Sequence, residues 1–80
     1  MTSDQKAKAY LLEILHACAG VPRPIEYLAT ELGLVAGRHV ATRELIDEMT
    51  EDGLAEVSKD GLGIRRWAIT AKGRAAWESL

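Results

Sequence analysis

The 80-residue sequence has few residues of several types, and each shortage excludes a class of protein. Cys18 is its single cysteine, so no disulfide can form within the chain, and we expect a reducing compartment, the cytoplasm. No apolar run reaches the roughly 20 residues that a membrane span requires, because Lys8, Glu13 and His16 interrupt the longest one. We therefore expect neither a membrane segment nor a secretory signal peptide.

What is present fits one small globular domain. The composition is 48% hydrophobic and 28% charged, as in an ordinary folded protein, and the length suits a single domain over residues 1–80. The formal charge of −2 gives no overall electrostatic attraction to nucleic acid. Any attraction to a polyanion has to come from a local group of cations.

The first segment is predicted to be an amphipathic helix. Thr2 and Gln5 have the spacing of a capping box, and Gly20 supplies a left-handed stop. Apolar residues recur at helical period and form one stripe, which consists of Ala7, Leu11, Ile14, Leu15 and Cys18. Leu12 is apolar but lies off this stripe, so we expect the helix to touch more than one neighbour.

Two shorter helices are predicted next. The second begins at Pro24 and ends at Gly33. A turn over 34–39 separates it from a third helix over about 40–52, which Gly53 closes.

After Gly53 the apolar period changes from 3.6 to 2, which indicates strands. The predicted elements are a strand over 54–58, a turn over 59–63, a strand over 64–69 and a helix over 71–80. Trp67 and Ile69 share one strand face, which we expect to point into the core, and Thr70 is placed to cap the last helix.

Three segments give the chain a resemblance to a known fold. They are residues 25–34, the exit Glu51-Asp52-Gly53-Leu54, and residues 65–74. The last is similar to the ending "L/I-T-x-x-G-R" of the bacterial MarR- and PadR-like transcriptional regulators. The resemblance implies an α+β winged helix-turn-helix, with three helices, a two-stranded hairpin wing and a short C-terminal helix, that binds double-stranded DNA. The interval from Gly33 to Gly53 is about three residues longer than the usual MarR-like spacing, which leaves the start of the third helix open.

In this fold the N-terminal end of the third helix enters the major groove, and the hairpin meets phosphates or the minor groove. The residues that the resemblance places there are Arg38, His39, Thr42 and Arg43 at the helix, and Lys59, Arg65 and Arg66 on the hairpin. Arg23, just ahead of the second helix, could add a phosphate contact.

The third helix is acidic. Residues 40–53 carry one arginine against five carboxylates, a net charge of −4. Such a helix would be repelled if its whole length lay along the phosphates, so we expect it to approach DNA by its leading end. This requires the cationic hairpin and that leading end to face the same side.

The acidic third helix also permits an alternative function, in which it binds a protein. The outer face of the third helix, made of Glu44, Asp47, Glu48 and Glu51, could present to a basic protein. The chain would then be a winged-helix protein-interaction module, such as an antirepressor or an assembly subunit, that does not bind DNA.

The oligomeric state is also open. Tyr10, Leu12 and Trp77 are apolar residues of the first and last helices, through which winged-helix regulators often dimerise. A homodimer would match a palindromic DNA site. The alternative is a monomer in which Trp77 covers its own core.

Metal and catalytic chemistry are not expected. His16 and Cys18 point about 160° apart on a helix, so they cannot share an ion, and His39 stands alone. The serines have no histidine and acid at a recognisable spacing. We therefore predict no cofactor, no metal site and no enzymatic activity.

Overall fold

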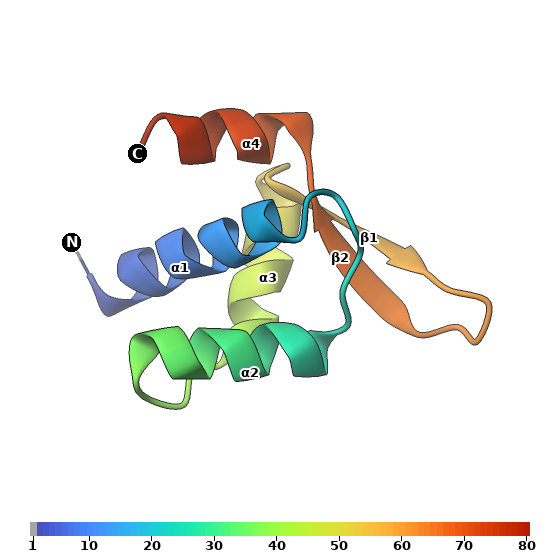
Figure 1. The fold of residues 1–80 in the computed structure, drawn as a ribbon, viewed down its shortest axis with the longest axis horizontal. Helices are drawn as coiled ribbons and strands as arrows, with labels where there is room; N and C mark the ends of the chain where they lie inside the picture. Colours follow the sequence, from blue (N-terminus) through green and yellow to red (C-terminus); the bar gives the residue numbers. More distant parts are fainter. Residues whose placement is uncertain (1) are drawn as a thin grey trace.

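The computed structural model describes residues 2–80, which form four helices with a hairpin between the third and the fourth. The helices are α1 (Ser3–Ala17), α2 (Ile25–Ala36), α3 (Thr42–Glu51) and α4 (Ala71–Glu78), and the strands are β1 (Ala55–Lys59) and β2 (Arg65–Ile69). Figure 1 shows α1 between α4 and α2, with α3 behind them and the hairpin projecting from one side. The predicted α+β winged-helix arrangement is confirmed.

Helix α1 begins and ends as its sequence indicates. The Thr2 hydroxyl accepts a hydrogen bond from the Gln5 amide (3.1 Å), and the Gln5 side chain accepts one from the Thr2 amide (2.9 Å). This capping box satisfies two backbone donors that the first turn leaves unpaired. After the C-cap residue Cys18, Ala19 and Gly20 both take a positive φ and turn the chain away.

The sequence predicted that helix α2 ends at Gly33, but the helix continues for about one more turn, to Ala36. Gly37 takes the left-handed conformation (φ 69°), and its amide donates to the Gly33 carbonyl oxygen (2.9 Å). Gly33 lowers helix propensity, but Leu32 before it is fully buried, and tertiary packing outweighs a propensity cost of about 1 kcal/mol. The extra residues of this interval therefore lengthen α2, and α3 begins at Thr42.

The hairpin register determines which side chains share a face. Val57 lies opposite Trp67, and Lys59 lies opposite Arg65. Residues directly opposite each other, and every second residue along a strand, project from the same face. Lys59, Arg65, Val57 and Trp67 therefore share one face of the hairpin, which we call the wing face.

A short extended segment pairs with the hairpin as a third strand, which the sequence did not predict. Arg23 forms an antiparallel bridge with Trp67, in which each amide donates to the other's carbonyl oxygen (2.9 and 2.8 Å). The bridge ties the segment before α2 to β2, so that the start of α2 has a fixed position beside the wing.

One core joins all the elements except the outer half of the hairpin. Its buried apolar residues are Ala7, Leu11, Leu12, Ile14 and Leu15 of α1, Leu28 and Leu32 of α2, Leu45, Ile46 and Met49 of α3, and Ala55, Trp67 and Ile69 of the hairpin. Trp67 and Ile69 thus point inward as predicted. Among residues 2–80, no helix is long and apolar enough to cross a membrane.

Helix α4 is fixed at its start by Thr70. The Thr70 hydroxyl accepts a hydrogen bond from the Gly73 amide (3.0 Å), as the sequence predicts for an N-cap, and donates one to the Gly53 carbonyl oxygen (2.5 Å). The same residue therefore starts α4 and holds it to the end of α3.

Candidate nucleic-acid interface

The first turn of α3 lies against the wing face. The guanidinium carbon of Arg43 lies 5.2 Å from the centre of the Trp67 ring, within the range of a cation–π contact. Lys59 and Arg65 extend the same hairpin face beyond Trp67 toward the tip, and both are exposed. The leading end of α3 and two cations of the hairpin therefore face the same side of the molecule, as an end-on approach of α3 requires.

Arg23 is a fourth cation on this side. Because it pairs with Trp67, its side chain leaves the short sheet on the wing face. Its guanidinium carbon lies 4.6 Å from the centre of the Tyr27 ring of α2. The Arg23 Nε is buried and has no hydrogen-bond partner within residues 2–80.

Arg66 does not belong to this set. It projects from the opposite face of the hairpin, and its Nε donates to the Asp60 carboxylate (2.9 Å). The sequence grouped Arg65 and Arg66 because they are adjacent, whereas strand geometry separates them. The bond to Arg66, together with those from the Leu62 and Ile64 amides, holds the pKa of Asp60 below its usual range.

Thr42 is not available to a base. Only 3% of its surface is exposed, and its hydroxyl donates to the Val40 carbonyl oxygen (3.1 Å). The prediction of a DNA contact at Thr42 is therefore wrong, because the helical face that carries Thr42 packs into the core.

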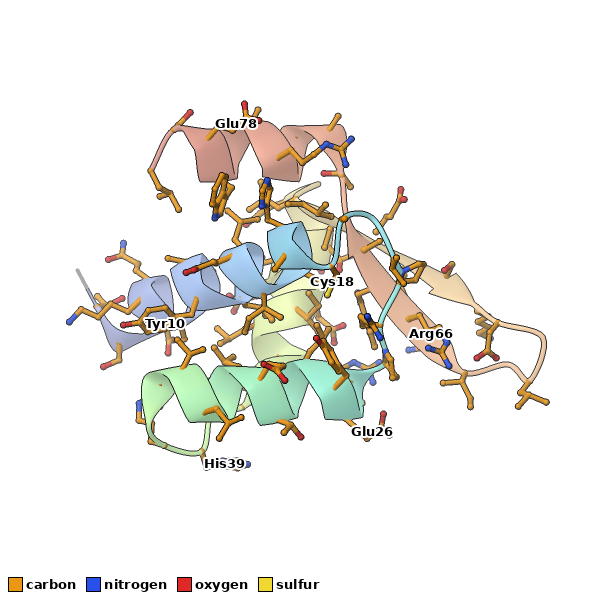
Figure 2. All side chains as sticks on the ribbon, viewed as in Figure 1. Tyr10, Cys18, Glu26, His39, Arg66 and Glu78 are labelled. Atoms are coloured by element: carbon orange, nitrogen blue, oxygen red, sulfur yellow. The ribbon has the colours of Figure 1, made fainter. Side chains whose placement is uncertain are left out.

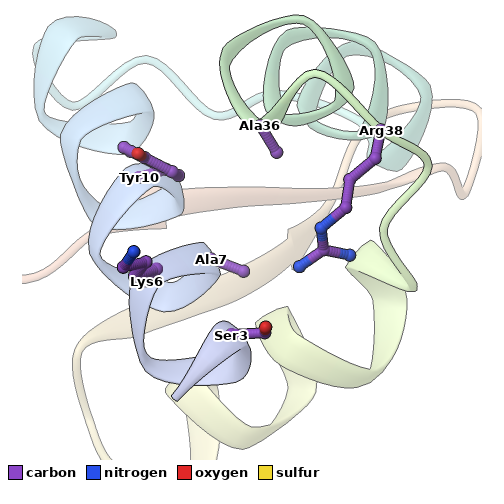
Figure 3. Close-up of a pocket in the computed structure, with 6 residues that line it drawn as sticks. All are labelled: Ser3, Lys6, Ala7, Tyr10, Ala36 and Arg38. Atoms are coloured by element: carbon purple, nitrogen blue, oxygen red, sulfur yellow. The ribbon is translucent and has the colours of Figure 1, made fainter. Parts of the chain in front are cut away.

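Arg38 and His39 lie away from the wing. Arg38 lines a cavity of about 260 Å³ with residues of α1, and Figure 3 shows its side chain extending toward Ser3 and Ala7. Figure 2 places His39 beside the loop below α2, well apart from Arg66 on the hairpin. The structure thus joins Arg23, Arg43, Lys59 and Arg65 on one side, and separates them from Arg38 and His39.

The acidity of α3 is partly offset by cations of other elements, which the sequence did not indicate. Lys8 of α1 pairs with Glu48 (2.7 Å), and the Lys72 ammonium donates to the Asp52 carbonyl oxygen (2.6 Å). The hydrogen bond to Glu48 raises the pKa of Lys8, and the charges of Asp52 and Asp4 act in the same direction. No spacing rule links residues 8 and 48, so only the packing of α1 on α3 reveals the pair.

The residues predicted to form a dimer surface have different environments. Leu12 is 5% exposed and belongs to the core, because α1 packs on α4 as well as on α2 and α3. This leaves Leu12 almost no surface for a second copy, and the prediction is corrected on that ground. Tyr10 and Trp77 are partly buried against the core, and the indole of Trp77 stacks on His16. A dimer contact through them stays a prediction.

Within the described part of the chain, no group of three or more His, Cys, Asp or Glu residues could hold a metal ion. The donors gathered on the wing face are guanidinium and ammonium groups, which bind anions and not cations. This side of the molecule therefore presents groups whose charge suits an anion.

Comparison with known proteins gives a likeness in fold. No protein-family model matches the chain, and no curated protein matches it in sequence. It is similar to the crystal structure of a MarR-family transcriptional regulator from Silicibacter pomeroyi, with 30% identity and a TM-score of 0.66 over 91% of this chain and 47% of that one. It is also similar to a probable transcriptional regulator from Pseudomonas aeruginosa, with 22% identity and a TM-score of 0.64 over 90% of this chain and 52% of that one.

The chain spans about half the length of these two proteins. The likeness agrees with the order of helices, the antiparallel hairpin and the placement of α3 beside it. The chain is therefore a winged helix-turn-helix domain similar to that of the MarR-family transcriptional regulators.

Proposed function

We propose that this domain binds double-stranded DNA and acts in transcriptional regulation, without enzymatic activity. The observation that carries the proposal is the position of Arg43 over Trp67, beside Lys59 and Arg65 on the wing face. The likeness to MarR-family regulators supports the same function.

In this proposal the cations contact different parts of the DNA. Lys59 and Arg65 are exposed on the protruding hairpin and contact phosphates, whose negative charge supplies most of the affinity. Arg43 at the first turn of α3 reads a base edge, and arginine matches guanine through two parallel hydrogen bonds. Arg23, on the Tyr27 ring, adds a phosphate contact near the start of α2.

Arg43 has to leave Asp47 to reach a base. Its Nε lies 3.2 Å from both carboxylate oxygens of Asp47, on the next turn of the same helix. Both side chains are about half exposed, and an exposed pair at this spacing is worth only about 0.3–0.5 kcal/mol. A bidentate guanine contact discriminates against a wrong base by about 1–3 kcal/mol, which is more than that loss.

The test is a titration of duplex DNA at several salt concentrations, read by fluorescence anisotropy. Each phosphate contact contributes about 0.9 to the slope of log affinity against log salt. We expect the double variant Lys59→Ala/Arg65→Ala to bind more weakly and to flatten the slope by about 2.

A matched control removes the same charge elsewhere. The double variant Lys6→Ala/Arg74→Ala takes two exposed cations from α1 and α4 and should keep the wild-type slope. If both double variants change the slope equally, binding follows net charge and the wing face has no special part. If the wild-type domain retains no duplex at low salt, DNA binding itself is wrong.

A protein-interaction function is the second candidate. Glu44 and Glu51 are exposed on α3, and neither takes part in a salt bridge within the described residues. The measurement is retention of a basic protein partner after nuclease treatment. Retention that the double variant Glu44→Gln/Glu51→Gln abolishes, with no DNA binding by the wild-type domain, would favour this function.

A further inference from the structure

The tip of the hairpin is apolar and exposed. Leu62 is 86% exposed and Ile64, at the end of the turn, is 45% exposed, whereas Val57 (46%) lies further back on β1, opposite Trp67. Single exposed leucines are common on protein surfaces, so the exposure alone indicates little. Its importance here comes from how the turn is held and from the charges next to it.

The turn holds Leu62 in a fixed position. One oxygen of the Asp60 carboxylate accepts hydrogen bonds from the Leu62 amide (2.8 Å) and the Ile64 amide (3.1 Å). The other oxygen accepts from the Arg66 Nε (2.9 Å). Gly63 closes the turn at a positive φ of 77° and donates to the Asp60 carbonyl oxygen (3.0 Å). The tip is therefore ordered before any partner binds.

The hydrogen bond from Arg66 to Asp60 also reduces the repulsion between the turn and a phosphate backbone. Asp60 lies next to the tip, where its charge would repel a phosphate backbone. Arg66 neutralises this carboxylate from the other face of the hairpin. A phosphate that approaches the tip therefore meets little net negative charge from the turn.

Two like charges flank the base of the tip. Lys59 and Arg65 are directly opposite each other on the last pair of the hairpin, and neither forms a salt bridge with any residue from 2 to 80. Like charges in this position are unfavourable in the free protein. A phosphate placed between them would relieve the repulsion, so the arrangement favours an anionic partner over an apolar one.

Resting on the proposed function, we propose that Leu62 is an apolar wedge that enters the minor groove and separates one base step. Figure 1 shows the hairpin projecting beyond the helices. Proteins that insert an apolar side chain in this way unstack the step and kink the duplex by about 20–90°. Pyrimidine–purine steps such as TA open most easily, so we expect the wedge to select them.

The experiment uses a duplex with 2-aminopurine at a central TA step and fluorophores at its two ends. The 2-aminopurine fluorescence reports unstacking, and energy transfer between the ends reports the kink. Wild-type protein should raise the first signal and shorten the end-to-end distance. Leu62→Ala should abolish both changes and weaken binding about tenfold, with the salt slope unchanged.

The matched control is Leu34→Ala, which removes the same side chain from an exposed position (74%) on α2. It should behave as wild type in every signal. Because Leu62 makes no buried contact, circular dichroism and the unfolding midpoint of Leu62→Ala should equal those of the wild-type protein.

Three results would overturn the wedge. Wild-type binding without unstacking, or unstacking that survives in Leu62→Ala, removes Leu62 from the DNA contact while the proposed function stands. A loss of self-association in Leu62→Ala, measured by sedimentation with unchanged DNA signals, assigns Leu62 to a second copy. Absence of DNA binding by the wild-type protein overturns the proposed function and the wedge together.

Discussion

The imidazole ring of His16 lies flat against the indole ring of Trp77, with 3.8 Å between the ring centroids and 9° between the planes. His16 belongs to the last turn of α1 and Trp77 to α4, so the stack joins the first and last helices of one chain. An indole that packs on its own chain covers part of the core and fixes the direction in which α4 leaves the domain.

We expect His16→Ala to lower the free energy of unfolding by about 1 kcal/mol, because stacked aromatic pairs contribute about 0.5–1.5 kcal/mol beyond their buried area. Urea unfolding followed by tryptophan fluorescence measures the change. His39→Ala removes an exposed imidazole and is the control. A double-mutant cycle with Trp77→Leu should give a coupling of the same size, and additive effects would show that the stack contributes nothing.

The paired variants Gly33→Ala and Gly37→Ala test where α2 ends. Gly33 is inside the helix, and an added Cβ would make an ordinary contact with the Arg38 carbonyl oxygen (3.6 Å), so alanine should stabilise by about 0.5–1 kcal/mol. Gly37 has a positive φ, where alanine costs about 1–2 kcal/mol. Thermal unfolding should shift upward for the first variant and downward for the second. The opposite pair of shifts would place the end of α2 at Gly33.

Gly73→Ala should be severely destabilising. A Cβ at Gly73 would overlap the Leu54 carbonyl oxygen, and this is a backbone atom that cannot rotate away. Overpacking of this kind costs about 3 kcal/mol, because α4 has to move off the hairpin. Gly61→Ala in the wing turn has nothing within 4 Å of the added carbon and serves as the control in chemical denaturation. Equal midpoints for the two variants would contradict the close approach of α4.

Acid should loosen the wing turn. The Arg66 guanidinium and the Leu62 and Ile64 amides hold the pKa of Asp60 below its ordinary value in the folded protein. A depressed pKa stabilises the turn above the pKa of the unfolded chain, and this contribution is lost as the pH falls through the folded pKa. The Leu62 and Ile64 amide resonances should therefore titrate together in NMR spectra, with a midpoint below the ordinary value of an aspartate.

In the variant Asp60→Asn the same two amides should show no acid transition. An unchanged transition would assign it to another carboxylate. A wild-type midpoint at or above the ordinary aspartate value would show that Arg66 and the two amides do not hold the Asp60 carboxylate.

Much of the fold could be predicted because its signals are local. The Thr2–Gln5 capping box, the left-handed Gly53 and the cap at Thr70 act within a few residues, and all three are present. The end of α2 is not determined by such a local signal, because two glycines, Gly33 and Gly37, are both candidates for its C-terminal stop. Helix propensity alone does not show which glycine ends the helix. The burial of Leu32, just before Gly33, favours continuation of the helix to Gly37.

Less of the candidate site could be predicted. The cation types on the hairpin were visible in the sequence, but strand alternation assigns Arg65 and Arg66 to opposite faces, and their roles follow from that. The burial of Thr42 removes one predicted contact. The bridge from Arg23 to Trp67 joins residues far apart in the chain, and no spacing rule predicts such a contact.

The order of the elements, most of their ends and the acidity of α3 follow from the sequence alone, because caps, turns and hydrophobic periods depend on neighbouring residues. In contrast, the contact of Arg43 with the wing, the pairing of Lys8 with Glu48 and the burial of Leu12 depend on how the elements pack. These contacts join separate elements, and their partners are set by how the helices and the hairpin pack around a shared apolar interior.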